Sequence, residues 1–399
     1  MVRAYLIVLG VTTVATFALT PVVRHVSLAR GLMVEPDERK VHERATPALG
    51  GVAMYLGVLA GLAAAWSVDR FAATFDAPTQ PIGVAGAATV AFAVGLVDEL
   101  RKIHRSGVSA PAKMSGLVLA GSILTLAGVS AIYFRVPFFG VFSLSPDLAA
   151  FVTVLWVVGM ANAINFIDGL DGLAAGIIAI ASAAFLIYAL RLDDEGFLID
   201  GNIGPLLAVI VLGVCLGFLP HNVHPARIFM GDCGALLLGV LMAASTISVG
   251  GSTDTAFDGS SFFFLAPLFI PLVILGVPIL DTLFAIVRRA SRRAGVTTPD
   301  KEHLHHRLLR LGHGHRRAVF ILWAWTALLS LVVLVPVYTG RGLGLVPLGV
   351  ASVGLLLYTV FHPGIRQRNG NAVDSGNGYR PAAVDAPRPP PVAADRTHS

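Results

Sequence analysis

Eleven stretches of mainly apolar residues follow one another along this chain, each close to the length of about 20 residues that a helix needs to cross a bilayer. Of all residues, 55% are hydrophobic and only 13% are charged, which excludes an ordinary soluble domain. We therefore predict an all-α, polytopic membrane protein with about 11 transmembrane helices. The predicted spans are residues 4–23, 48–66, 81–97, 112–132, 148–166, 170–190, 203–219, 233–249, 262–287, 318–338 and 343–361.

The basic residues are distributed unevenly between the two sides that these spans define. Most of the 29 Lys and Arg residues fall in loops after odd-numbered spans and in the C-terminal tail. Cytoplasmic loops are enriched in these residues, so we predict an N-terminus outside and a cytoplasmic C-terminus, in the plasma membrane. The net charge of +5 then reflects these loops and indicates no nucleic-acid partner. Residues 1–365 form the predicted membrane domain, and residues 366–399 are expected to be a disordered cytoplasmic tail.

The polar segments that look like functional motifs all lie on the predicted cytoplasmic face. A lipid or solute transporter needs ionisable residues deep inside its spans, and only Asp281 comes close to that. A membrane scaffold whose acidic residues merely cap helices is a third alternative. The one-sided distribution favours an enzyme that takes one cytosolic substrate and one lipid substrate.

Four oxygen-bearing side chains recur at every third residue where the fifth span meets the sixth. They are Asn162, Asn165, Asp168 and Asp171. Adjacent members are neighbours on a helix, but three such steps turn a helix through half a revolution, so one helix cannot present all four on one face. Gly169 and Gly172 indicate that the helix ends here in a polar turn, which we predict to bind an anionic ligand through a cation. The alternative is a helix-terminal turn with solvated carboxylates.

Two further acidic sites lie at span ends on the same face. Asp98 and Glu99 follow the third span, with Lys102 and Lys113 nearby, and Asp232 precedes the eighth span between two glycines. Adjacent carboxylates repel each other and stay ionised most easily beside a metal or basic groups. Each acidic site alone could be a helix cap, but together they are better explained by one shared divalent cation. Oxygen-only ligands indicate Mg²⁺, or Mn²⁺, rather than zinc.

A basic loop before the tenth span contains five histidines. They are His303, His305, His306, His313 and His315. No thiolate lies nearby and the intervening residues are basic, which argues against zinc. A helix would display His303, His306 and Arg310 on neighbouring turns as a cationic receptor for phosphates. The alternative is a solvated cytoplasmic loop, which explains the arginines but not so many histidines.

Four of these segments resemble the signatures of the polyprenyl-phosphate N-acetylhexosamine-1-phosphate transferases. They are Asp98-Glu99, residues 165–172, residues 229–232 and His303-Leu304-His305-His306-Arg307. The resemblance extends from the first loop to about Arg317. The form of the histidine motif and the eleven spans are similar to the branch that transfers N-acetylglucosamine-1-phosphate, and residues 216–232 are similar to its actinobacterial members. The branch that transfers phospho-muramoyl-pentapeptide typically has ten spans and three consecutive histidines.

The chain departs from the family pattern at two places. Glu99 stands where the family usually has a second Asp, and its side chain reaches one methylene further. Cys233 and Ala235 stand where the family has serines, so two hydroxyls near Asp232 are lost. Neither departure removes a carboxylate.

The resemblance implies Mg²⁺-dependent transfer of N-acetylglucosamine-1-phosphate from UDP-N-acetylglucosamine to polyprenyl phosphate, with release of UMP. It implies Asn165 and Asp232 as metal ligands and Asp98, Glu99 and Asp168 as catalytic residues, with Asp98 the first choice for a base. The implied substrate-binding residues are Gly169, Leu170, Asp171, Phe229, His303, His305, His306 and Arg307. A family member that uses another UDP-N-acetylhexosamine is the nearest alternative. A homo-oligomer is compatible with these predictions.

Overall fold

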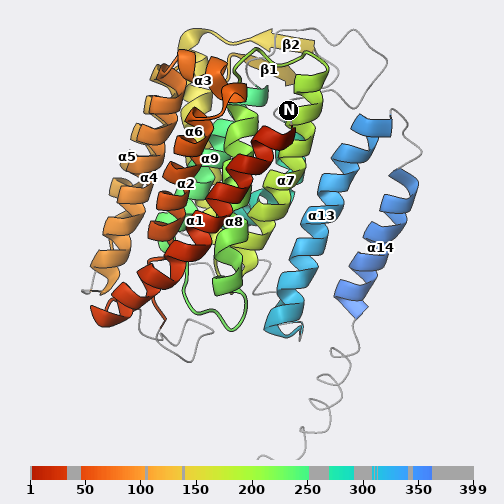
Figure 1. Cartoon of the computed structure of the whole chain (residues 1–399). Coiled ribbons are helices and arrows are strands. Elements are labelled where there is room, and N and C mark those ends of the chain that lie inside the picture. The colour runs from red at the N-terminus through yellow and green to blue at the C-terminus, as the bar shows by residue number, and fades with distance from the viewer. Residues whose placement is uncertain are drawn as a thin grey trace, which may run out of the picture.

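A computed structural model of the chain describes residues 2–33, 46–103, 107–136, 140–250, 269–291, 308–309, 311, 313–339 and 345–361. These residues form a bundle of helices with one short hairpin at one end (Figure 1). The motif from His303 to Arg307 and the predicted tail lie outside the described residues. The elements are α1 (Val2–Ala29), α2 (Gly50–Trp66), η1 (Asp69–Phe71), α3 (Ala72–Asp76), α4 (Thr79–Ile103), α5 (Ala110–Leu126), β1 (Tyr133–Val136), β2 (Gly140–Ser143), α6 (Pro146–Ile167), α7 (Leu173–Asp194), α8 (Gly204–Asn222), α9 (Gly231–Gly250), α10 (Phe269–Ile274), α11 (Gly276–Ser291), α13 (His315–Thr339) and α14 (Leu345–Phe361).

The helices follow the predicted apolar stretches closely. Each stretch overlaps one helix, except that residues 262–287 overlap the pair α10 and α11. Within the described residues, seven helices are long and apolar enough to cross a bilayer, namely α1, α4, α6, α7, α8, α9 and α13. The chain after α2 bends by 93°, and α5 and α14 are shorter apolar helices. The protein is therefore a multi-pass membrane protein, while the number of eleven spans stays a prediction.

The described residues form an all-α fold, as predicted, apart from one short hairpin. The strands β1 and β2 pair in antiparallel register, with Tyr133 opposite Ser143. We predicted helix up to residue 132, but α5 ends at Leu126 because Gly128 adopts φ = 85°. The amide of Val129 then donates to the carbonyl of Leu124 at 2.9 Å, which closes the helix end in the way that a glycine in the left-handed region allows.

The helix α9 lies at the centre of the bundle, and every residue from Cys233 to Gly250 is buried. It packs against α2, α4, α6 and α8. A helix that is apolar all round is stable only when other helices surround it. The first turn of α9 carries Asp232, so the residue that we predict to bind metal lies on the innermost helix.

Glycines bring the neighbouring helices unusually close to α9. A Cβ atom at Gly95 of α4 would lie 2.4 Å from the Cα of Cys233, and one at Gly239 of α9 would lie 2.4 Å from the Cα of Ala161 of α6. Small residues allow such backbone contacts between membrane helices. The approach at Gly95 places the end of α4, with Asp98 and Glu99, directly beside Asp232.

Candidate active site

The chain segment that leads into α9 is fixed against the start of α2. The amide of Phe229 donates to the carbonyl of Pro47 at 2.8 Å, and the amide of Gly50 donates to the carbonyl of Phe229 at 2.9 Å. Gly231 has φ = 65°, and a Cβ atom there would lie 2.2 Å from the carbonyl oxygen of Ala48. Only glycine fits both constraints. The turn at Gly231 places Asp232 in the first turn of α9, facing α4.

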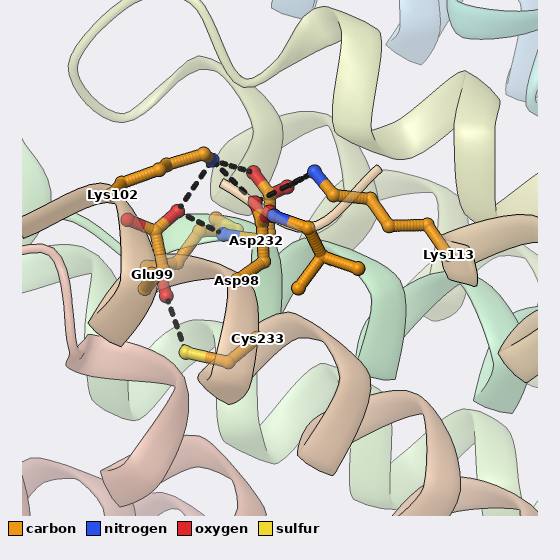
Figure 2. Close-up of polar contacts among 8 residues, drawn as sticks. Asp98, Glu99, Lys102, Lys113, Asp232 and Cys233 are labelled. Carbon is orange, nitrogen blue, oxygen red and sulfur yellow. Dashed lines mark hydrogen bonds and ion pairs between the residues drawn. The ribbon is translucent and has the colours of Figure 1, made fainter. Parts of the chain in front are cut away.

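Three carboxylates meet where α4 ends and α9 begins (Figure 2). One oxygen from each of Asp98, Glu99 and Asp232 lies within 4.8 Å of the others. Asp98 and Glu99 are buried, whereas the side chain of Asp232 is 14% exposed. The backbone amide of Asp232 donates to Oε1 of Glu99 at 2.9 Å, so the two helices are joined at the cluster itself.

Two lysines neutralise much of the charge of this cluster. Nζ of Lys102 lies 2.7 Å from Asp98 Oδ2, 3.2 Å from Glu99 Oε1 and 3.2 Å from Asp232 Oδ1. Nζ of Lys113, which comes from α5, lies 2.6 Å from Asp98 Oδ2 and 2.7 Å from Asp232 Oδ2 (Figure 2). The side chains of the lysines are 37% and 25% exposed, more than any of the three acids. A polyanion that approaches the cluster therefore meets the lysines first.

The donor set of this cluster fits a hard divalent cation. All three acids offer carboxylate oxygens, and three carboxylates leave one negative charge beyond what the two lysines balance. Oxygen ligands of this kind suit Mg²⁺ or Mn²⁺. Oδ1 of Asp98 accepts the amide of Val108 at 2.6 Å, so both carboxylate oxygens of Asp98 are engaged.

The polar turn after α6 forms as predicted. The helix α6 ends at Ile167, α7 begins at Leu173, and Gly172 adopts φ = 75°. Asn165 lies half-buried in the last turn of α6, and Asp168 follows it as the capping residue. Burial, then the negative charges of Asp232, Glu99 and Asp171, raise the pKa of Asp168 to about 8, although Lys102 opposes this. Asp168 is therefore harder to ionise than an ordinary aspartate.

Asp171 belongs to a second group of side chains, with His224 and His315. Nδ1 of His224 lies 2.7 Å from Asp171 Oδ2, which also accepts the amide of Ala226 at 3.1 Å. The backbone amide of Asp171 donates to Nε2 of His315 at 3.0 Å, and the two imidazole rings stack with centroids 4.3 Å apart. These hydrogen bonds engage one side-chain atom of each residue, namely Asp171 Oδ2, His224 Nδ1 and His315 Nε2. The group therefore orients Asp171 and ties the turn to the start of α13.

A cavity of about 310 Å³ opens beside this second group. Its polar lining comes from Asp171, His224, His315 and Arg316, and its apolar lining includes Phe320 and Trp323 of α13. Arg316 also donates to the carbonyl of His224 at 3.2 Å. The cavity is therefore lined by one arginine, two histidines and one aspartate beside aromatic side chains.

Asn222 connects the polar turn to the segment before α9. Its Oδ1 accepts the amide of Gly172 and its Nδ2 donates to the carbonyl of Ile228, both at 3.0 Å. Of the predicted turn residues, Gly169 is exposed and Leu170 is buried. The ring of Phe229 is half-buried beside this connection.

The structure brings together some of the predicted site residues and separates others. Asp98, Glu99 and Asp232 converge, and Asp168 is close enough to feel the charges of Glu99, Asp232 and Asp171. Asp171 joins a different group, and the predicted residues His303, His305, His306 and Arg307 lie outside the described residues. The sequence singled out neither His224 nor the pairing of His315 with Asp171. The pairing of Lys102 with Asp98 could have been predicted from the sequence, since the two residues lie four positions apart on one helix.

The chain is a membrane protein in which acids and lysines gather at one end of an apolar helix bundle. Residues 81–250 match glycosyl transferase family 4. The chain is 36% identical to decaprenyl-phosphate N-acetylglucosaminephosphotransferase of Mycolicibacterium smegmatis, over 89% of this chain and 88% of that protein. It is 34% identical to a probable undecaprenyl-phosphate N-acetylglucosaminyl 1-phosphate transferase of Bacillus subtilis, over 78% and 79%. It is also 30% identical to phospho-N-acetylmuramoyl-pentapeptide-transferase of M. smegmatis, over 81% and 94%. The chain belongs to glycosyl transferase family 4.

Proposed function

We propose that this protein transfers N-acetylglucosamine-1-phosphate from UDP-N-acetylglucosamine to a polyprenyl phosphate and releases UMP. This reaction would be the first membrane step in the assembly of a surface polysaccharide. The observation that carries the proposal is the convergence of Asp98, Glu99 and Asp232 with Lys102 and Lys113 at one end of the bundle. The choice of sugar is supported by 36% identity to the N-acetylglucosamine enzyme of M. smegmatis, against 30% to its muramoyl-pentapeptide enzyme.

The reaction exchanges one phosphorus–oxygen bond for another. An oxygen of the lipid phosphate attacks the phosphorus that bears the sugar, and the bond from that phosphorus to UMP breaks, so UMP leaves with the electron pair. A phosphate monoester has its second pKa near 6 and is already largely ionised at neutral pH. Little base catalysis is therefore needed. The main task is to bring two polyanions together and to align the in-line attack.

The residues of the site are suited to that task. We assign Mg²⁺ to Asp232 and Asn165, with Asp168 close by; the cation would neutralise phosphate charge and align the reacting groups. Lys102 and Lys113 are the most exposed charged groups of the cluster, so they are placed to contact the phosphates directly. Both oxygens of Asp98 are engaged by these lysines and by the amide of Val108.

The other predicted roles remain part of this proposal. Asp98 is the first candidate for a group that orients or deprotonates the lipid phosphate. Gly169, Leu170, Asp171 and Phe229 are proposed to form the nucleotide pocket, where His224 and the amide of Ala226 orient the carboxylate of Asp171. His303, His305, His306 and Arg307 are proposed to hold the diphosphate.

We further propose that the chain spans the plasma membrane eleven times, with its N-terminus outside and the site on the cytoplasmic face. The excess of Lys and Arg in alternate loops supports this orientation. So does the position of the site, which lies at the end of the bundle opposite to the start of α1 (Figure 1). A site at the cytoplasmic surface can take UDP-sugar from solution and polyprenyl phosphate from the bilayer.

The test is a transfer assay on the purified protein with decaprenyl or undecaprenyl phosphate and a panel of UDP-sugars. We expect UMP release that requires Mg²⁺, is fastest with UDP-N-acetylglucosamine and disappears in Asp232→Ala. Faster turnover of UDP-N-acetylmuramoyl-pentapeptide would reassign the sugar within the family. No UMP release from any UDP-sugar would contradict the proposal and favour a transporter or scaffold.

A further inference from the structure

We propose that Glu99 is a positioning residue: its carboxylate caps the N-terminus of α9 from the neighbouring helix α4 and thereby holds Asp232 in place for the transfer reaction. The inference rests on the proposed function for the role of Asp232. It gives Glu99 a task that differs from contact with a substrate or with the reacting phosphates.

The first turn of α9 needs a hydrogen-bond acceptor that its own sequence does not supply. The first amides of any helix have no partner within the helix, and a Ser, Thr, Asp or Asn just before the helix usually accepts one of them. The residue before α9 is Met230, whose side chain has no oxygen. The amide of Asp232 donates instead to Oε1 of Glu99 at 2.9 Å. Glu99, which lies on α4, therefore takes the role that a capping residue directly before α9 would otherwise have.

The close contact between α4 and α9 explains why this acceptor is Glu. A Cβ atom at Gly231 would lie 3.1 Å from Cγ of Glu99, so the side chain of Glu99 runs along the backbone of the turn. An Asp at this position would withdraw the carboxylate by about 1.5 Å, the length of one carbon–carbon bond. The hydrogen bond to Asp232 would then be lost. This chain has Glu where the family pattern has Asp, and the longer side chain of Glu reaches the amide of Asp232.

The surroundings of Glu99 agree with an indirect role. Glu99 is only 5% exposed, and the same Oε1 atom also accepts from Nζ of Lys102 at 3.2 Å. The side chain of Asp232 is more exposed and receives both lysines on its own oxygens. Of these two acids, Asp232 is the one that a cation or a phosphate can reach.

The experiment compares Glu99→Gln, Glu99→Asp and Glu99→Ala in the full-length protein. Gln keeps an oxygen acceptor at the same reach but removes the charge, Asp keeps the charge but shortens the reach, and Ala removes both. We expect Glu99→Gln, which keeps the acceptor, to retain several-fold more kcat and to need less Mg²⁺ than either Glu99→Asp or Glu99→Ala. Glu99→Asp and Glu99→Ala should lose kcat by at least tenfold, need several-fold more Mg²⁺ and melt at lower temperature in EDTA.

Two matched variants complete the design. Asp232→Asn makes the same acid-to-amide change on the residue proposed to bind metal, and it should lose more activity than Glu99→Gln. Glu195→Gln removes the charge of a surface Glu paired with Arg191, and it should change nothing at the site. If Glu99→Gln loses as much activity as Glu99→Ala while melting like the parent protein, the charge itself is needed and the positioning role is overturned. The melting series in EDTA remains informative even if the parent protein shows no transfer, so a failure of the proposed function is distinguishable from a failure of this inference.

Discussion

At the level of single residues, the site owes its geometry to pairings between helices that are distant in sequence. Lys113 reaches Asp232 across 119 positions, and Glu99 reaches the amide of Asp232 across 133. That Asp98, Glu99 and Asp232 would converge was predictable, because each lies at a span end on the same face. The partners of Asp171 were not predictable, because His224 lies in a loop and His315 begins α13, and tertiary packing decides where both lie. Residue type indicated the chemistry, but only the fold selects which donor meets which acceptor.

Asp168 provides a prediction at this scale, because its pKa of about 8 in the folded protein lies far above its ordinary value of 3.8. Between these values the folded state binds more protons than the unfolded state, so stability falls as pH rises. In EDTA, we expect the melting temperature to drop by a few degrees more between pH 6 and pH 9 in the parent protein than in Asp168→Asn. Added Mg²⁺ should reduce this difference, because a cation beside Asp232 favours ionised Asp168. Equal pH dependence of both proteins in EDTA would contradict the raised pKa.

At the level of elements, helices were predictable from length and hydrophobicity, whereas their exact ends depended on local geometry. Every predicted apolar span overlaps at least one helix, since an apolar run of this length is stable in a bilayer as an α-helix. The end of α5 was predicted too late because the apolar run continues past Gly128, which ends the helix, and the hairpin of β1 and β2 lies in the segment between two predicted spans. The polar turn at residues 168–172 was found because Gly169 and Gly172 mark it. Glycine position was thus the better guide to where a helix ends.

The contact between α4 and α9 gives a prediction at the level of elements. In Gly95→Ala the new methyl group would meet the backbone of Cys233 at 2.4 Å, so the two helices must separate and carry Asp98 and Glu99 away from Asp232. We expect activity to fall by at least tenfold, with a lower melting temperature. Gly86→Ala on the same helix is the matched control, because its methyl group would meet only Cγ2 of Ile123, at an ordinary 3.5 Å. Equal activity of the two variants would show that the close approach does not position the site.

In the molecule as a whole, the polar groups and the apolar helices are separated along the axis of the bundle. One end holds both polar groups, around Asp232 and around Asp171, and the other end holds the hairpin and the start of α1 (Figure 1). Between them, helices of apolar and small residues enclose α9. A reaction between a cytosolic nucleotide sugar and a membrane lipid needs such an arrangement, because the charged chemistry must stay at one surface while the lipid chain stays in the bilayer. The orientation of the bundle then decides which compartment supplies the sugar.

Cysteines introduced one at a time at exposed positions test that orientation. The native Cys215 and Cys233 are both buried, so they should not react with a labelling reagent. Ser109 is exposed beside Val108, whose amide contacts Asp98, and Ser67 is exposed just after the far end of α2. With a membrane-impermeant maleimide on intact cells, we expect Ser67→Cys to react and Ser109→Cys to react only after the membrane is opened. The parent protein is the control and should stay unlabelled in both conditions. Labelling of Ser109→Cys from outside would place the site on the outer face, where cytosolic UDP-sugar cannot reach it, and would exclude the proposed reaction in this orientation.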